Sequence, residues 1–241
     1  MPPERGKLRE ERKGGKGLPR VLEAYVGEYA SGKSENAINR ALRLVREGRR
    51  VRLADLDLVE PAYTLRPLKR TLEAQGLEVL AWETKELIGP GEAAITLKKE
   101  IVSTLAFPGD VIIDVGYGVE GRRLLNLIKG AFPPANGEEA LRLIMVVNAA
   151  RPLTSSLPLI LAYLDEFGPV DGLINNTHLG EETTVELIQE GAGLVTAAAR
   201  RVGCPVVATT AWRPYARQLG PVDRMGNPVW PIERFMSGAF W

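Results

Sequence analysis

Short apolar runs alternate with helix-like stretches along most of the chain. The runs have the length of buried strands and lie at residues 21–26, 51–54, 78–82, 111–113, 143–147, 170–174 and 205–209. Apolar residues at spacings of three and four predict helices at 35–47, 92–106, 121–131, 156–167 and 182–201. This alternation predicts a three-layer α/β/α protein, in which helices cover both faces of a mainly parallel, twisted sheet of about seven strands.

The first predicted strand leads into a glycine-rich loop at residues 27–34. Its residues match the pattern Gly-x-x-x-x-Gly-Lys-[Ser/Thr], and they are Gly27, Glu28, Tyr29, Ala30, Ser31, Gly32, Lys33 and Ser34. The amphipathic helix that follows is predicted to end at Gly48, where a left-handed cap costs little. In this context we expect the loop to cradle phosphates with its backbone N–H groups. Lys33 would add a positive charge, and the Ser34 hydroxyl could ligate Mg²⁺.

Acidic residues stand at the carboxyl ends of two predicted strands, where ligands gather in parallel sheets. Asp55 and Asp57 follow the second strand one residue apart, so strand alternation would send both side chains the same way. The apolar run at 111–113 ends in Asp114, which is the form of a Walker B strand whose Asp holds Mg²⁺. The glycines at 116 and 118 indicate a loop that could sense a γ-phosphate.

Amide side chains end two further strands, at Asn148 and at Asn175 with Asn176. Asn is a common turn former, but its amide also offers a donor and an acceptor that can pair with a base edge. These residues are therefore consistent with a turn-forming role and with recognition of a base. No Asn-Lys-x-Asp or Thr-Lys-x-Asp guanine motif occurs in the chain, which favours ATP over GTP.

Composition limits the class of protein. The 241 residues are 45% hydrophobic, enough for one sizeable domain. Residues 1–20 hold seven Lys/Arg and three Glu, a net +4, so the total of +1 leaves −3 for residues 21–241. We therefore expect no nucleic-acid partner. We expect a disordered basic arm at 1–19, a nucleotide-binding domain at 20–211 and an aromatic-rich tail at 212–241 that packs on the domain or on a partner.

The sequence also argues against a membrane or an iron–sulfur protein. No apolar run approaches membrane-spanning length, and the arm lacks the apolar core of a signal peptide, so a cytoplasmic location is expected. Cys204 is the sole cysteine, which excludes paired cysteine ligands within the chain. A shared Fe–S cluster is therefore not expected.

Together these motifs resemble the MinD/ParA-like branch of P-loop NTPases, within the CobQ/CobB/MinD/ParA nucleotide-binding class. The resemblance spans about residues 20–210 and rests on the loop, the Asp-x-Asp pair, the Walker B strand and the Asn-ended strand, in that order. The stretches 55–61 and 175–183 are also similar to an ATP-binding subgroup of this class.

The resemblance implies a role for each motif residue. Lys33 would hold the β- and γ-phosphates, Ser34 would hold Mg²⁺ with support from Asp55 and Asp114, Asp57 would orient the attacking water, and Asn175, or alternatively Asn176, would read adenine. The family typically works as a nucleotide-sandwich dimer, which implies a homodimer at least when ATP is bound.

One position departs from the family pattern. The signature lysine that reaches the partner's phosphates follows the first loop glycine, and here that position is Glu28. A carboxylate cannot neutralise transition-state charge, so either Arg66 or Arg151 substitutes for the lysine or hydrolysis is slow.

Three functions are consistent with these residues. The main hypothesis is a Mg²⁺-dependent ATPase that acts as a nucleotide-controlled switch toward a protein partner. The first alternative is a P-loop kinase or ATP-dependent ligase, with Arg66, Lys69 and Arg70 along an acceptor site. The second alternative, which Glu28 motivates, is an ATP-binding regulatory module that does not hydrolyse ATP.

Overall fold

The structure is a computed structural model that describes residues 19–57, 65–81, 99–116, 118–132 and 140–236. Among these residues it contains one sheet with eight parallel strands, in the order β3-β2-β4-β1-β5-β6-β7-β8. The strands are β1 (Leu22–Val26), β2 (Val51–Asp55), β3 (Glu78–Leu80), β4 (Asp110–Asp114), β5 (Arg142–Val147), β6 (Gly172–Asn175), β7 (Val206–Trp212) and β8 (Val229–Ile232).

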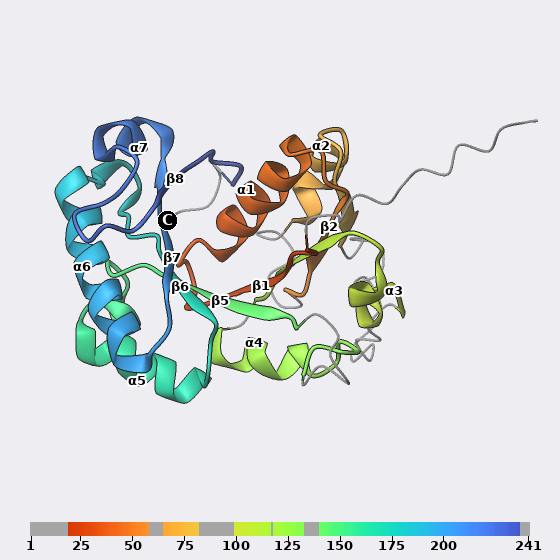
Figure 1. The fold of residues 1–241 in the computed structure, drawn as a ribbon, viewed down its shortest axis with the longest axis horizontal. Helices are drawn as coiled ribbons and strands as arrows, with labels where there is room; N and C mark the ends of the chain where they lie inside the picture. The colour runs from red at the N-terminus through yellow and green to blue at the C-terminus, as the bar shows by residue number, and fades with distance from the viewer. Residues whose placement is uncertain (1–18, 58–64, 82–98, 117, 133–139, 237–241) are drawn as a thin grey trace, which may run out of the picture.

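Helices cover both faces of this sheet (Figure 1). They are α1 (Lys33–Arg46), α2 (Lys69–Glu73), α3 (Lys99–Val102), α4 (Gly118–Leu125), α5 (Leu157–Phe167), α6 (Val185–Val202) and α7 (Arg213–Leu219). One apolar core joins the sheet to α3, α4, α5 and α6, and a second joins its other face to α1 and α2. The predicted three-layer α/β/α class is confirmed.

The order of the strands positions the candidate residues. The central strand β1 pairs with β4 on one side and with β5 on the other, and β2 lies beyond β4. Because all strands run the same way, their carboxyl ends share one edge of the sheet. The loop after β1 therefore lies beside Asp114 at the end of β4 and near Asp55 at the end of β2, which pairs in register with Asp114.

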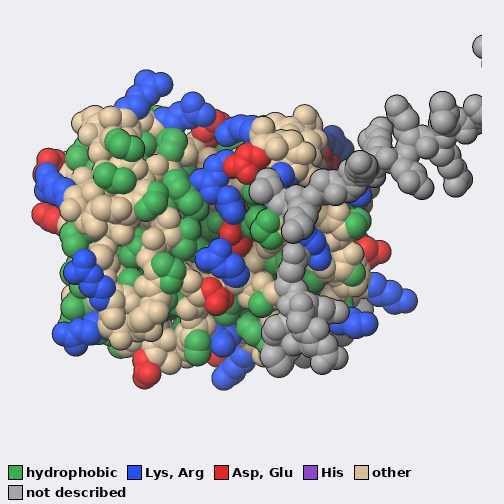
Figure 2. Space-filling view, viewed as in Figure 1, with side chains coloured by type: hydrophobic (Ala, Val, Ile, Leu, Met, Phe, Trp, Pro, Cys, Tyr) green, Lys and Arg blue, Asp and Glu red, His purple; other side chains and the backbone are tan. Residues whose placement is uncertain are grey.

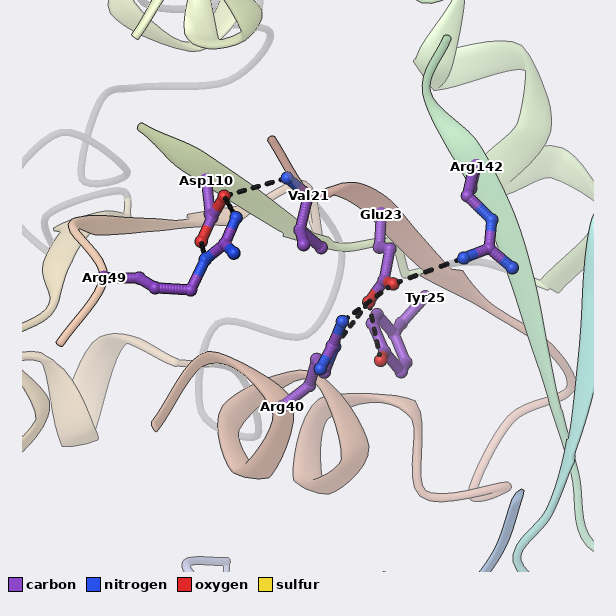
Figure 3. Close-up of polar contacts among 7 residues, drawn as sticks. All are labelled: Val21, Glu23, Tyr25, Arg40, Arg49, Asp110 and Arg142. Atoms are coloured by element: carbon purple, nitrogen blue, oxygen red, sulfur yellow. Dashed lines mark hydrogen bonds and ion pairs between the residues drawn. The ribbon is translucent and has the colours of Figure 1, made fainter. Parts of the chain in front are cut away.

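Local sequence accounts for the central elements. On α1 the buried residues Ala37, Ile38, Ala41 and Leu42 recur at helical spacing and pack against the sheet. The helix ends before Gly48, which adopts φ 78° as its left-handed conformation requires. At the opposite end of the sheet, Asp110 accepts a 2.8 Å hydrogen bond from the Val21 backbone N–H and pairs with Arg49, fixing β4 beside β1 (Figure 3).

The carboxyl-terminal region is more regular than the sequence pattern predicts. The seven expected strands correspond to β1–β7, but the region at 212–241 also contributes α7 and the eighth strand. Strand β8 contains Pro231, and an edge strand tolerates proline because half of its backbone groups have no neighbouring strand.

The helix expected at 92–106 is described only from residue 99, as α3 and a 3₁₀ turn, and the one expected at 121–131 forms earlier, as α4. Residues 1–18 of the expected arm lie outside the described residues.

Candidate functional site

The loop at residues 27–34 folds into a tight backbone curve between β1 and α1. Gly27 has φ 146° and Gly32 has φ 88°, and a side chain on Gly27 would lie 2.3 Å from the Val146 carbonyl oxygen. Ala30 has φ 55° and is the only residue other than glycine with a positive φ in the described part of the chain. Such strain costs about 1–3 kcal/mol and persists where the surroundings enforce it, typically at functional sites.

Asn176, at the end of β6, holds the loop in this shape. Its amide nitrogen Nδ2 donates a 2.8 Å hydrogen bond to the Ser31 carbonyl oxygen, and its Oδ1 accepts one of 2.9 Å from the Thr210 hydroxyl. A Cβ atom on Gly32 would lie 2.1 Å from the same Nδ2. The second loop glycine is therefore needed for the approach of Asn176 as well as for its backbone conformation.

The Glu28 side chain is directed inward, toward the turn that follows β5. The residue is 7% exposed, and its carboxylate accepts hydrogen bonds from the Thr154 hydroxyl at 2.8 Å and the Leu153 N–H at 3.3 Å. Both partners belong to the 3₁₀ turn η4 (Pro152–Thr154) after β5. The residue at the signature-lysine position thus fastens the loop to the neighbouring strand connection.

Lys33 and Ser34 begin α1 beside Asp114. The Lys33 ammonium Nζ donates a 2.9 Å hydrogen bond to the Glu28 carbonyl oxygen, which folds this side chain back over the loop. Burial raises the pKa of Asp114 to about 6, and the neighbouring Ser34 hydroxyl and Lys33 ammonium partly oppose the increase. A cation at this position would favour the ionised form of Asp114.

Asp55 and Asp57 lie at the end of β2 in different surroundings. Asp55 is fully buried, and its Oδ1 accepts a 2.8 Å hydrogen bond from the Asp57 N–H. Burial, and then the negative charge of Asp114, raise the pKa of Asp55 to about 8. Asp57 is half-buried, and a Cβ atom on Gly116 would lie 2.4 Å from its Cγ. The glycine loop after β4 therefore packs directly on the Asp57 carboxyl group.

Arg66 supplies a positive charge beside this acidic pair. It begins the 3₁₀ turn η1 (Arg66–Leu68), its side chain is 5% exposed, and its Nη2 donates a 3.0 Å hydrogen bond to the Asp57 carbonyl oxygen. Its Nε lies 4.0 Å from Asp55 Oδ2. Arg66 and Arg151 are the two predicted substitutes for the signature lysine. Arg66 lies next to Asp55 and Asp57, whereas Arg151 lies near His178 and lowers the pKa of that residue.

The carboxylates fit a magnesium ion that also binds phosphate. Asp55 Oδ2 and both Asp114 oxygens are buried and make no hydrogen bond of ordinary geometry with the described residues. Mg²⁺ is commonly held by one or two carboxylates together with substrate phosphates and water. The described residues contain no group of three His, Cys, Asp or Glu side chains placed to hold a metal without such a ligand.

A pocket lies at the ends of β6 and β7, beside the loop. Gly32 of the loop and Glu35 of α1 line it, and its remaining lining residues are Asn176, Thr177, His178, Gly180, Thr183, Ile188, Thr210, Ala211, Trp212, Tyr215, Ile232, Arg234 and Met236. The Trp212 and Tyr215 rings meet edge to face, with centroids 6.1 Å apart. Burial, and then the charges of Arg151 and Arg234, lower the pKa of His178 to about 4. A flat, largely apolar group could fit against these walls.

The carboxyl-terminal segment completes this pocket, which the sequence pattern did not indicate. The Glu35 carboxylate accepts hydrogen bonds from the backbone N–H groups of Phe235 and Met236, at 2.9 and 2.7 Å. Asn39 exchanges two hydrogen bonds of 2.8 Å with the Glu233 backbone. The tail is therefore fastened along α1. The only sequence feature that could have indicated that this segment lines the pocket is its content of arginine and aromatic residues.

The three candidate amides are all engaged within the chain. Asn175 is fully buried, donates to the Ile188 carbonyl and the Thr209 hydroxyl, and accepts a 2.7 Å hydrogen bond from the Thr177 hydroxyl. Asn148 donates to the His178 carbonyl oxygen and accepts from the His178 N–H. With Asn176 bound to the loop, these amides shape the site and offer few hydrogen bonds to a base in this conformation.

The parallel sheet, its helical layers and the loop after β1 define a P-loop NTPase fold, similar to that of the receptor FtsY. Cell division protein FtsY from Thermotoga maritima aligns with a TM-score of 0.51 and 18% identity, over 80% of this chain and 62% of its own. Chloroplast FtsY from Physcomitrella patens has a TM-score of 0.51 and 17% identity, over 80% and 59%. The signal recognition particle receptor FtsY from Elizabethkingia anophelis has a TM-score of 0.51 and 18% identity, over 83% and 61%.

At these identities the likeness concerns the fold, and the chain spans 59–62% of the FtsY chains. No protein-family model and no curated protein matches the sequence. The MinD/ParA assignment and the choice of nucleotide therefore remain predictions. None of the helices that the structure describes is long and apolar enough to cross a membrane.

Proposed function

We propose that the protein is a Mg²⁺-dependent nucleoside triphosphatase that works as a nucleotide-controlled switch, with ATP as its nucleotide. The observation that carries this proposal is that Gly32 of the loop also lines the pocket at the ends of β6 and β7. Phosphates on the loop would place the attached ribose and base along the ends of β6 and β7. The apolar walls there, including the paired rings of Trp212 and Tyr215, suit a purine.

We assign phosphate binding, Mg²⁺ binding and positioning of the attacking water to different residues of the chain. The loop N–H groups and Lys33 would bind the phosphates, and Ser34, Asp55 and Asp114 would hold Mg²⁺, which neutralises phosphate charge. Asp57 would orient the attacking water. Its contact with Gly116 supports a switch, because movement of the glycine loop after β4 would shift this carboxyl group.

The inward orientation of Glu28 affects the rate and the assembly. Its carboxylate is held by Thr154 and Leu153, so this position offers no cation to a second copy of the chain. Arg66 would supply the positive charge from within the same chain. We infer that hydrolysis is slow and that a homodimer with ATP, if it forms, does not depend on residue 28.

Calorimetry with ATP and with GTP in the presence of Mg²⁺ tests the nucleotide site. ATP should bind the unaltered protein more tightly than GTP, and Lys33→Ala should weaken binding at least about tenfold because a full charge is lost from the phosphate site. Lys129→Ala, which removes an exposed lysine outside the site, is the matched control. Equal ATP affinity of Lys33→Ala and the unaltered protein would contradict the phosphate site, and preferential GTP binding would overturn the choice of ATP.

Phosphate release tests the catalytic assignment. Asp57→Asn should retain ATP binding and lose most phosphate release, because an amide positions water poorly and carries no negative charge. Asp165→Asn, at an exposed position on α5, should leave both properties unchanged. Undiminished release by Asp57→Asn would assign the water to another residue.

A further inference from the structure

A second pocket lies between α1 and β8. Thr210 and Ile232 line both this pocket and the first one. On α1 the arginines Arg40, Arg43 and Arg46 recur at every third position, which places them on one face of the helix, and all three line the pocket. In Figure 2, Lys and Arg side chains gather with a few Asp and Glu in a band down the middle of the molecule.

Two carboxylates neutralise part of this charge. Arg40 Nε and Nη2 contact the Glu23 carboxylate at 2.8 and 3.2 Å, and the Tyr25 hydroxyl donates to the same carboxylate at 3.2 Å (Figure 3). Arg46 and Arg213, which also lines the pocket, share a single oxygen of Glu233. Both side chains are about half exposed to solvent, where such pairs contribute little.

Of the four arginines that line this pocket, Arg43 alone makes no hydrogen bond or ion pair with the residues that the structure describes. Its Cζ lies 3.7 Å from the centre of the Trp230 ring, and its Nε is buried with no hydrogen-bond partner among the described residues. Burial, and then the charge of Arg40, lower the pKa of Arg43. The face of an indole ring compensates a cation only in part, and a buried donor without an acceptor is unfavourable. An oxyanion that accepts hydrogen bonds from the terminal Nη groups of Arg43 would compensate this charge.

We propose that the pocket between α1 and β8 binds a small molecule through a carboxylate or phosphate group that accepts hydrogen bonds from Arg43. Guanidinium groups bind planar oxyanions through paired N–H donors, and the neighbouring arginines add long-range attraction. Most other polar groups here are already used: Asn36 donates to the Gly32 carbonyl and Asn39 binds the Glu233 backbone. The oxyanion is therefore the recognised feature, and Trp230 lines the pocket beside Arg43.

Calorimetry on a Lys33→Ala background favours this pocket, because the altered loop competes only weakly for phosphate. The probes are inorganic phosphate and pyrophosphate in one series, and succinate and citrate in the other. We expect a probe from at least one series to bind with a stoichiometry of one, and the series that binds identifies the group. Adding Arg43→Met should weaken that binding at least about tenfold. Adding Arg50→Met removes an arginine that lies over Phe107 beside β2, and binding should not change.

Arg43→Lys keeps the positive charge but loses the planar guanidinium group with its paired N–H donors. This variant replaces Arg43→Met in the test if Arg43→Met does not fold. It should also weaken binding several-fold. The proposal is overturned if no probe binds Lys33→Ala, or if the Arg43 variant that folds binds as tightly as its parent. Because the nucleotide test uses the intact loop and this test uses the altered one, either can fail without the other.

Discussion

The Glu28 carboxylate accepts a 2.8 Å hydrogen bond from the Thr154 hydroxyl, which joins the phosphate loop to the turn after β5. The same hydroxyl oxygen lies 2.7 Å from the Asn148 carbonyl oxygen, so its one proton is shared between two acceptors and Thr154 connects the ends of β1 and β5. An acidic residue at this position is thus part of the loop's support.

Glu28→Ala should lower the free energy of unfolding by about 1–3 kcal/mol, because the Leu153 N–H and the Thr154 hydroxyl lose a buried charged acceptor. Glu28→Lys should be at least as destabilising and should not accelerate ATP hydrolysis, since an ammonium would face two donors. Chemical denaturation and phosphate release measure these effects. Thr154→Ser, which keeps the hydroxyl, is the control, and a stable Glu28→Lys variant with faster turnover would contradict the structural role.

Gly116→Ala should displace the Asp57 carboxyl group, because the added Cβ would lie 2.4 Å from its Cγ. We expect phosphate release to fall at least about tenfold with little change in ATP affinity, since positioning of the attacking water is lost while the phosphate loop is intact. Gly193→Ala in α6 adds the same methyl group where no atom lies within 4 Å. Unaltered turnover in Gly116→Ala would show that the position of Asp57 does not limit the reaction.

Glu35→Ala should release the carboxyl-terminal segment from α1. The carboxylate accepts the backbone N–H groups of Phe235 and Met236, and hydrogen bonds to charged groups contribute about 1.5–3 kcal/mol. Amide hydrogen exchange at these two residues should accelerate about tenfold or more. Glu120→Ala removes an exposed carboxylate from α4 and should leave this exchange unchanged. Protection that persists in Glu35→Ala would mean that apolar packing alone holds the segment.

His178 should make stability depend on pH between about 4 and 6.5. Burial and the charges of Arg151 and Arg234 lower its pKa from 6.5 to about 4, so the unfolded chain binds this proton more tightly. Stability should therefore rise with pH across this window and be lost as pH falls through it, by about 1–3 kcal/mol. The chain has one histidine, so His178→Asn isolates the effect. If denaturant titrations show that the free energy of unfolding changes with pH in the same way in both proteins, this role of His178 is contradicted.

Much of the candidate site was predictable because its motifs are local. The loop, Asp55, Asp57 and Asp114 follow strands whose apolar runs are visible in the sequence, and parallel strands bring their carboxyl ends to one edge. The fold class follows from the same alternation of strands and helices. The sequence pattern does not predict strand β8, because a four-residue edge strand with a proline has no distinctive period.

The groups that could bind phosphate and magnesium can be identified from the sequence, since each motif depends on neighbours along the chain. The partners of groups that are distant in sequence depend on the packed fold. It pairs Asn176 with Ser31 across 145 residues, turns Glu28 toward Thr154 and brings Trp230 over Arg43. The physical reason is that a buried polar group takes whichever partner the packed chain brings within reach, and that partner has no fixed spacing in sequence.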